Sequence, residues 1–586
     1  MKYLLSEESN YDKLPFINVK GYENECYIGW KAIAQQLKRA CEQLNQDKII
    51  IIAETYTGIY DFVASEICEV LLPSQFFYAS EALKSHEEID KLIYPDTTDD
   101  EIFGFMTKLQ IDEFFDIHQL SLLQDKIKNI EKGVIMVYGI GASLVAEADI
   151  LLYLDMPRWE GQLRFRRNEV SNLGVDNKTE TASLQYKRAY FVDWRVCDQI
   201  KKNSILQWDF VLDTVDPKIP KMINGRAYRQ GLSNAIHRPF RVVPFFDPGP
   251  WGGQWMKEVC DLDKNVENYA WCFDGVPEEN SLQLKFADVL FETPAINLVF
   301  FAPKELLGDS VYDKFGAEFP IRFDFLDTME GGNLSLQVHP LTAYIQEKFG
   351  IQYTQDESYY LLDATEDAFV YLGLKENIQP QEMISSLQIS KTSGSFDAEK
   401  YLEKWKAKKH DHFLIPAGTV HCSGANAMVL EISATPYIFT FKLWDWDRLG
   451  LDGRPRPINI EHGEKVIQWD RNAVWTKANL VNQVSLIAEG DGWKEEKTGL
   501  HELEFIETRR HWFTKKVTHY NPHGVNVLNL VEGAEVVIES PDHEFEAFHI
   551  HYAETFIVPA TIKIYTIQPY GAAEGKLCAT IKAYVR

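Results

Sequence analysis

Four polar side chains in the C-terminal half of the chain are of the types that bind a transition-metal ion. Gln337 and His339 lie two residues apart in Asn333-Leu-Ser-Leu-Gln-Val-His-Pro340, and the period of two in a β-strand directs both side chains to the same face. Glu357 and His421 follow in separate short segments. Two imidazoles, one carboxylate and a neutral amide suit a zinc-like ion. Each residue alone is more often an ordinary hydrogen-bonded polar side chain, so the predicted metal site depends on all four together.

The ordered motifs around these residues resemble the type I mannose-6-phosphate isomerase family. An acidic residue that opens a strand, Glu357, stands between two of the motifs. The resemblance covers more than half of the chain, and the motifs that carry it are Leu334-Ser-Leu-Gln-Val-His-Pro340, Leu414-Ile-Pro-Ala-Gly-Thr-Val-His421, Leu430-Glu-Ile-Ser433, Leu443-Trp-Asp-Trp-Asp-Arg448 and Arg454-Pro-Arg-Pro-Ile-Asn-Ile460.

The resemblance implies a cupin fold and a single zinc ion. It implies that the substrate is a small sugar phosphate, and that mannose 6-phosphate and fructose 6-phosphate are interconverted through a cis-enediol. The residues that match the metal ligands of the family are Gln337, His339, Glu357 and His421. Arg448 and Arg456 stand where short bacterial members of the family place arginines near the substrate.

A phosphate group needs a local cluster of positive charge. Arg448, Arg454 and Arg456 lie close together in the sequence, after a predicted strand that contains Lys442. Guanidinium groups bind phosphate oxygens in a bidentate manner, so these arginines are candidates for a phosphate clamp. The alternative is that they form ion pairs with the nearby carboxylates Asp445, Asp447 and Asp452.

The proton-transfer group is left open among Glu431, Lys442 and Asp324, because a neighbouring metal ion or arginine could tune the pKa of any of them. The family usually carries a lysine two residues before the glutamate ligand, where this chain has Gln355. It also commonly has a lysine in the strand before the Gln-x-His motif, where this chain offers Arg322 and Asp324. These departures favour an alternative function, that of a non-catalytic metal-binding sensor of a sugar or sugar phosphate.

The N-terminal residues 1–232 alternate helical and apolar strand-like segments, which predicts an α/β domain with a parallel sheet covered on both faces. A helix is expected at residues 30–44. Buried strands are expected at Lys48-Ile-Ile-Ile-Ile-Ala53, Gly133-Val-Ile-Met-Val-Tyr138, Ile150-Leu-Leu-Tyr-Leu154 and Ala189-Tyr-Phe-Val192.

The turn after the first of these strands resembles a phosphate-binding loop that has lost its key residues. In Ala53-Glu-Thr-Tyr-Thr-Gly-Ile-Tyr60 only Gly58 fits the Gly-x-x-x-x-Gly-Lys-Ser/Thr pattern, and Ile59 replaces the lysine. The stretch Arg158 to Arg167 resembles the lid of small P-loop kinases. We therefore predict a degenerate P-loop nucleoside-kinase-like domain with a structural or interaction role. Anion binding through the arginines and an active nucleotide kinase are the alternatives.

The rest of the chain predicts an all-β bicupin. Residues 240–480 are expected to form the metal-binding jelly roll, and residues 481–586 a second, smaller cupin-like barrel. A helical insertion is expected at residues 377–409, including Asp397-Ala-Glu-Lys-Tyr-Leu-Glu-Lys-Trp405. Expected strands include Leu298-Val-Phe-Phe301, Pro320-Ile-Arg-Phe-Asp-Phe-Leu326 and Tyr437-Ile-Phe-Thr-Phe-Lys-Leu443.

The second barrel carries its own possible metal motif. His549, His551 and Glu554 match the first metal motif of many cupins in residue type and order. A later histidine partner is missing from this frame. We therefore expect no second metal ion.

The composition limits partners and location. A formal charge of −27 disfavours nucleic acid and anionic membranes, which attract basic patches. The 8 cysteines are scattered and form no Cys-x-x-Cys pair, which argues against disulfides and thiolate metal sites. No apolar run is long enough to span a bilayer, and the first residues do not resemble a signal peptide. We expect a soluble cytoplasmic protein whose N-terminal domain serves a protein partner or self-association.

Overall fold

The computed structural model divides the chain into two compact units that are interleaved in sequence. It describes residues 1–586 except 1, 6, 7, 394, 435–438, 452, 454 and 500. The β-rich unit comprises Met1–Pro15, Ile236–Val276 and Ala302–Arg586, and the α/β unit comprises Phe16–Ala235 and Pro277–Phe301. The predicted clamp residue Arg454 therefore lies outside the described residues. No helix of the described chain is long and apolar enough to cross a membrane.

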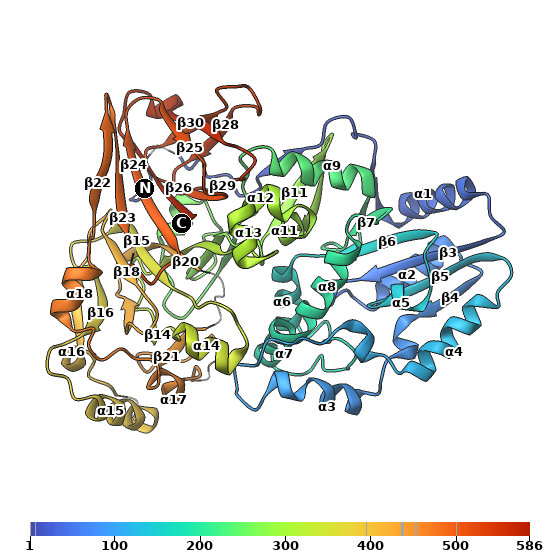
Figure 1. Ribbon diagram of the computed structural model, residues 1–586, viewed down its shortest axis with the longest axis horizontal. Coiled ribbons are helices and arrows are strands. Elements are labelled where there is room, and N and C mark those ends of the chain that lie inside the picture. The colour runs from blue at the N-terminus through green and yellow to red at the C-terminus, as the bar shows by residue number, and fades with distance from the viewer. Residues whose placement is uncertain are drawn as a thin grey trace. The chain divides into compact units, whose positions relative to one another are not determined.

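The α/β unit contains a sheet of seven strands in the order β2-β8-β7-β6-β3-β5-β4 (Figure 1). The neighbours from β4 to β7 pair in parallel, and β8 and β2 extend the sheet with antiparallel pairing. The predicted strands at residues 48–53, 133–138 and 150–154 are confirmed. The strand bounds are β2 Cys26–Ile28, β3 Lys48–Thr55, β4 Gln75–Tyr78, β5 Gly133–Gly139, β6 Ile150–Asp155, β7 Phe210–Asp213 and β8 Lys221–Asn224.

Helices α1 and α2 cover part of this sheet with apolar side chains. Ile33 and Leu37 of α1 and Val63 and Ile67 of α2 belong to one buried cluster with the strands β3, β5, β6 and β7. The predicted helix at residues 30–44 is confirmed. The helix bounds in this unit are α1 Gly29–Leu44, α2 Phe62–Leu71, α3 His86–Thr97, α4 Ile117–Lys128, α5 Ala142–Val145, α6 Arg158–Arg166, α7 Ala182–Arg188, α8 Trp194–Ser204, α9 Gly225–Ile236 and α11 Ile296–Phe301, together with the short helices η1 Ala79–Ala82 and η2 Ile111–Phe114.

Two predicted strands are wrong because they are helical. Ala189–Val192 lies in the π-helix η3 (Ala189–Asp193), which continues α7 into α8. Leu298–Phe301 lies in helix α11. A short apolar run that is buried on all sides has the same composition in a helix and in a strand, so its periodicity does not separate the two.

The segment 277–301 returns to the α/β unit from within the C-terminal part of the sequence. It forms β11 (Ser281–Phe286), β12 (Val289–Pro294) and α11. Strand β11 pairs antiparallel with β12 and in parallel with β1 (Phe16–Asn18). This sheet of three strands therefore joins residues that are far apart in the sequence.

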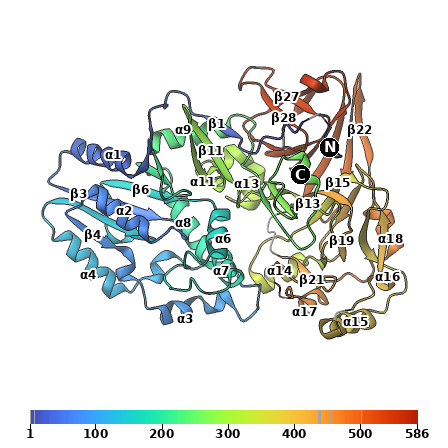
Figure 2. The same ribbon diagram turned by 180° about the vertical axis from the view of Figure 1, so that it is seen from behind.

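The β-rich unit contains two pairs of antiparallel sheets (Figure 2). Short strands were predicted here, and they are present. The first pair consists of β18 (His412–Ile415), β15 (Glu357–Ala364), β20 (Ala427–Ala434), β13 (Ile321–Asp327), β10 (Trp271–Gly275) and β9 (Phe245–Asp247) in one sheet, and of β17 (Leu402–Lys406), β16 (Phe369–Leu374), β19 (His421–Ser423), β14 (Leu336–Val338) and β21 (Phe441–Trp444) in the other.

The second pair of sheets is built from residues 485–585 and encloses its own apolar core, which includes Leu528, Ile538 and Phe556. Its sheets are β22 (Ser485–Gly490), β23 (Trp493–Gly499), β24 (Ile506–Phe513), β31 (Cys578–Val585), β26 (Asn526–Glu532) and β29 (Thr555–Val558), and β25 (Val517–Tyr520), β30 (Ile564–Pro569), β27 (Glu535–Glu539) and β28 (Phe548–His551). Helices in this unit are α10 Trp255–Val259, α12 Pro303–Leu307, α13 Asp309–Phe315, α14 Thr342–Phe349, α15 Pro380–Ser393, α16 Ala398–Tyr401, α17 Ile460–Gly463 and α18 Ala473–Asn479, and the 3-10 helix η4 Gly571–Ala573.

The predicted helix at residues 397–405 is wrong beyond Tyr401. Residues Leu402–Lys406 form β17, which pairs with β16. The indole nitrogen of Trp405 donates a hydrogen bond to the carbonyl oxygen of Leu372 at 2.9 Å. An exposed sheet edge offers backbone hydrogen bonds that override the helical preference of a short charged segment.

Candidate metal centre

Three side chains from three strands or strand ends converge in the first pair of sheets. His339 follows β14, Glu357 opens β15 and His421 opens β19. The Nε2 atom of His339 lies 3.0 Å from Oε2 of Glu357, and Nε2 of His421 lies 2.8 Å from Oε1 of the same carboxylate. All three residues are buried. They are the one group of three such residues in the described chain that could hold a metal ion.

Backbone carbonyl groups fix the orientation of both imidazoles. Nδ1 of His339 lies 3.1 Å from the carbonyl oxygen of Phe439, and Nδ1 of His421 lies 2.8 Å from that of Thr419. A carbonyl oxygen only accepts hydrogen bonds, so each Nδ1 carries a proton and Nε2 is the atom available to a metal ion. Both Nε2 atoms face the carboxylate of Glu357. A metal ion between them would bind both imidazoles and the carboxylate, and the cluster therefore fits a metal ion.

The carboxylate and the imidazoles of this cluster stabilise each other's charged forms. Burial acts to raise the pKa of Glu357, but the two imidazoles outweigh it and hold that pKa well below its ordinary range. Burial acts to lower the pKa of His339, and the Glu357 carboxylate outweighs that effect and raises it. A buried carboxylate that stays charged is a suitable ligand for a dication.

Gln337 adjoins this cluster on the same face of the sheet. It pairs directly with His421 on one side and with Lys442 on the other, and residues that face each other in antiparallel strands share a face. The Gln337 amide nitrogen, as oriented, lies 3.1 Å from Nε2 of His421. Rotation of the amide by about 180° would present its oxygen as a fourth ligand. The structure thus brings the four predicted ligands together.

Lys442 faces Gln337 in the neighbouring strand, so that Gln337, His421 and Lys442 form a row across the sheet. Lys442 is partly exposed, whereas the metal ligands are buried. Burial, assisted by the positive charge of Arg456, lowers the pKa of the Lys442 amine to about 7. Gln337 is 7% exposed and the Arg456 side chain is 17% exposed, whereas His339 is fully buried. Solvent access therefore increases from the metal ligands toward Lys442 and Arg456.

The sheet that contains Glu357 also carries a buried polar cluster on its strands β13 and β20. Asp324 pairs directly with Glu431, and the Arg322 guanidinium lies 3.1 Å from Asp324 and 3.7 Å from Glu431. Burial, together with the charges of Asp324 and Glu357, raises the pKa of Glu431 well above its ordinary value. Of the predicted proton-transfer candidates, Asp324 and Glu431 are therefore held inside the protein by an arginine.

Gln355 has a contact that sequence reasoning missed. Its side-chain nitrogen donates a hydrogen bond to Oε2 of Glu357 at 3.1 Å and lies 3.5 Å from Glu431. From the sequence alone, Gln355 was notable only because the isomerase family usually has a lysine at this position. The spacing of two residues in an extended segment, which puts Gln355 and Glu357 on one face, is the signal that could have indicated the contact.

Two of the predicted arginines, Arg448 and Arg456, bind one carboxylate. Asp445 accepts hydrogen bonds from Arg448 at 2.6 Å and from Arg456 at 3.0 Å. Arg448 also donates to the carbonyl oxygen of Asn333, whereas Arg456 donates to the hydroxyl of Ser335. The ion pairing that the sequence analysis gave as an alternative is thus present at Asp445. Two guanidinium groups against one carboxylate leave an excess of positive charge.

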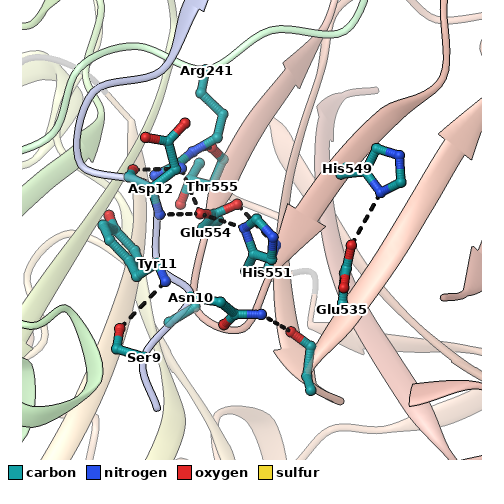
Figure 3. Close-up of polar contacts among 12 residues, drawn as sticks. Ser9, Asn10, Tyr11, Asp12, Arg241, Glu535, His549, His551, Glu554 and Thr555 are labelled. Carbon is teal, nitrogen blue, oxygen red and sulfur yellow. Dashed lines mark hydrogen bonds and ion pairs between the residues drawn. The ribbon is translucent and has the colours of Figure 1, made fainter. Parts of the chain in front are cut away.

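The histidine motif of the second pair of sheets does not converge on one centre (Figure 3). His549 pairs with Glu535 at 3.1 Å, whereas His551 pairs with Glu554 at 3.1 Å. Glu554 is further bound by Arg241 at 2.8 Å and by the backbone N–H of Asp12 at 2.6 Å. Figure 3 shows the two histidines directed to different carboxylates. Arg241 takes the place of a cation beside Glu554.

The residues that resemble a phosphate loop and lid make internal bonds. Glu54 accepts hydrogen bonds from the backbone N–H of Gly141 at 2.6 Å and of Ser143 at 2.9 Å. Arg164 donates to the carbonyl oxygen of Gly58 at 2.9 Å, and Arg158 forms a buried ion pair with Asp198. Glu54 of the loop and the guanidinium groups of Arg158 and Arg164 are therefore already bound to groups of the protein.

Comparison with known proteins gives one family match and several named relatives. Residues 29–237 match a family model described as a domain of unknown function (DUF8485). The chain is also similar to mannose-6-phosphate isomerase of Streptococcus mutans, with 26% identity over 232 residues that span 39% of this chain and 68% of the relative. ManA of Bacillus subtilis is 29% identical over 153 residues, which span 26% of this chain and 45% of that protein.

Solved structures give matches of the same kind. The mannose 6-phosphate isomerase of Bacillus subtilis aligns with a TM-score of 0.48 and 20% identity, over 59% of this chain and 99% of that one. A mannose 6-phosphate isomerase bound with zinc and yttrium aligns with a TM-score of 0.44 and 14% identity, over 59% and 99%. Because these TM-scores are below 0.5, the alignments carry no argument about function.

Proposed function

We propose that the β-rich unit is a zinc-dependent aldose–ketose isomerase that interconverts mannose 6-phosphate and fructose 6-phosphate. The observation that carries this proposal is the convergence of His339, Glu357 and His421, in which both Nε2 atoms face one carboxylate and both Nδ1 atoms are held by backbone carbonyls. The sequence relatives of this region are named mannose-6-phosphate isomerases, which supports a sugar-phosphate isomerase. We propose further that its two pairs of sheets are the two barrels of a bicupin.

The reaction moves a proton between C1 and C2 of the sugar through a cis-enediol. The metal ion would supply Lewis-acid stabilisation of negative charge on the sugar oxygens. Lys442 is the proposed proton carrier, because it lies on the row of Gln337 and His421 and its pKa of about 7 suits both acceptance and donation of a proton. Arg456 is the proposed phosphate-binding group, because its positive charge acts on Lys442 and its side chain is 17% exposed.

A coupled assay of mannose 6-phosphate isomerisation, with and without a chelator, tests this function. We expect turnover that a chelator abolishes and that added zinc restores. A protein that binds one equivalent of zinc and binds the sugar phosphate, but shows no turnover, would contradict the isomerase. That result would instead support the alternative below.

The alternative is a metal-binding sensor of a sugar or sugar phosphate, with the α/β unit as its interaction surface. The observation that favours it is Gln355, whose neutral amide binds Glu357 where the isomerase family usually has a lysine. An active nucleotide kinase is less favoured, because Glu54 and Arg164 bind groups of the protein itself. Thermal stability that increases with ATP and magnesium would contradict this ranking.

A further inference from the structure

The second pair of sheets encloses a polar cavity that the proposed isomerase reaction does not use. The cavity has a volume of about 220 Å3 and is lined by residues of β23, β24, β25, β26 and β31. Three of its lining side chains, His511, His519 and Lys582, are at least nine-tenths buried. Interior positions of such a barrel are normally apolar, so buried cationic and imidazole groups around a cavity call for a ligand.

Lys582 is a buried cation that lacks a counter-ion at contact distance. It lies in β31 opposite Arg509 of β24 and is 6% exposed. Within the described residues its amine makes no ion pair and no side-chain hydrogen bond, although it lies over the ring of Tyr584 at 5.7 Å. Burial dominates its titration and lowers its pKa to about 8. A buried ammonium group without a partner is unfavourable, and an anion in the cavity would remove that penalty.

The two histidines add hydrogen-bonding groups without protein partners. Both ring nitrogens of His519 are buried and have no hydrogen-bond partner among the described residues, although the ring stacks on Tyr565 at 4.9 Å. His511 pairs through Nε2 with Glu495 at 3.3 Å, and its Nδ1 has no partner in the described chain. A neutral imidazole always carries one N–H, so His519 offers at least one unused donor.

The nearby carboxylates are bound by another cation. Arg509 lies 2.8 Å from Glu495 and 2.7 Å from Glu507. Both carboxylates therefore have an ion-pair partner at contact distance, whereas the Lys582 amine and the ring nitrogens of His519 have no such contact within the described residues. The positive charges of Arg509 and Lys582 also make the cavity unsuitable for a metal cation.

We propose that this cavity is a second ligand site, which binds a small oxyanion such as a phosphate or a small carboxylate between Lys582 and His519. A charge-assisted hydrogen bond from the ammonium group would supply the main attraction. The volume corresponds to about seven water molecules. It therefore accepts an ion of the size of orthophosphate and excludes a nucleotide.

Inorganic phosphate is the probe that tests the site in the full-length protein. The Arg456→Met variant serves as the background, so that binding at the proposed isomerase site is weakened. In that background we expect calorimetric phosphate binding that Lys582→Met and His519→Phe each weaken at least tenfold. The phenylalanine keeps the stacking on Tyr565, which separates loss of the donor from loss of the fold. The control variant Lys563→Met removes an exposed lysine that does not line the cavity, and it should change binding less than twofold.

Thermal unfolding without phosphate supplies a second readout. Lys582→Met removes a buried charge that has no ion-pair partner at contact distance, so its unfolding midpoint should equal or exceed that of the parent chain, and added phosphate should no longer raise it. Phosphate binding that is equal in Lys582→Met and Lys563→Met would overturn the proposal, as would the absence of phosphate binding in the parent chain. Binding that requires added zinc would show a metal site instead.

Discussion

The two backbone carbonyls that orient His339 and His421 leave Glu357 as the residue that supplies negative charge to the metal centre. Glu357→Gln keeps the shape of the side chain and removes that charge. We expect metal affinity to fall at least about 100-fold, because loss of a ligand charge exceeds the roughly 10- to 100-fold effect of outer contacts. Metal content by mass spectrometry and isomerase activity should fall together.

The matched control for this substitution is Glu535→Gln, which affects a glutamate that pairs with the exposed His549 of the second barrel. It should leave the metal content unchanged. Equal zinc content in the native protein and in Glu357→Gln would contradict the proposed centre. At the same scale, the sequence predicted the ligands by type and order, but the contacts of Gln355 with Glu431 and of Arg448 with Asn333 depend on segments that meet only in the fold.

Lys442 lies beside the metal ligands without being one of them, since it pairs with Gln337 across two strands. Lys442→Met should lower kcat by about 100- to 10,000-fold, the usual contribution of a proton-transfer group. Zinc content should not change. Steady-state kinetics with metal analysis would check this, and Lys465→Met, a lysine on the chain after α17, is the matched control. Loss of zinc in Lys442→Met would show a structural role.

Glu54 at the end of β3 binds the loop at the start of α5 with a carboxylate that is costly to ionise. Burial outweighs the hydrogen bonds from Ser143 and Gly141 and raises its pKa from 4.5 to about 7. The folded state thus binds more protons than the unfolded state between these values, so the contribution of Glu54 to stability is present below pH 4.5 and lost as pH rises through about 7.

Glu54→Gln should remove this dependence. The loss of stability from pH 5 to pH 8 should be smaller than in the parent chain by up to about 3 kcal/mol, since one pKa unit corresponds to about 1.4 kcal/mol. Denaturant unfolding at several pH values measures this difference. Glu69→Gln, which changes an exposed glutamate on α2, should leave the slope unaltered. Parallel curves for Glu54→Gln and the parent chain would contradict the argument.

Strands with long apolar runs between turns, such as β3 and β5, were predictable because parallel strands that are buried on both faces have a distinctive composition. The runs at Ala189–Val192 and Leu298–Phe301 were not, because they are short and equally apolar, and only their neighbours in the fold make them helical. Residues Leu402–Lys406 form a strand because β16 offers them an edge. Local pattern decides long elements, and tertiary contacts decide short ones.

At the scale of the whole molecule, the units do not follow the order of the sequence. Residues Phe16–Ala235 and Pro277–Phe301 form one unit, and Met1–Pro15 belongs to the other. The sequence indicated a boundary near residues 232–240, since Pro and Gly interrupt the chain there. It gave no sign that β11 and β12 return to the α/β unit, because such pairing depends on a partner strand more than 250 residues away, β1.

A truncated chain of residues 236–586 tests this interleaving. It would retain β11 but lose β1, which pairs with it, and α9, whose Gly231 packs against Leu284. The side chains of Leu282, Leu284 and Phe286 lie on one face of β11 and are fully buried in the intact chain. Exposure of each of these side chains to water costs about 1.5 to 3 kcal/mol.

We expect the truncated chain to aggregate, as measured by size-exclusion chromatography. A variant of the same fragment with three substitutions in β11 should aggregate less; these are Leu282→Ser, Leu284→Ser and Phe286→Ser. A fragment that is monomeric without these substitutions would show that the segment 277–301 is stable without the α/β unit.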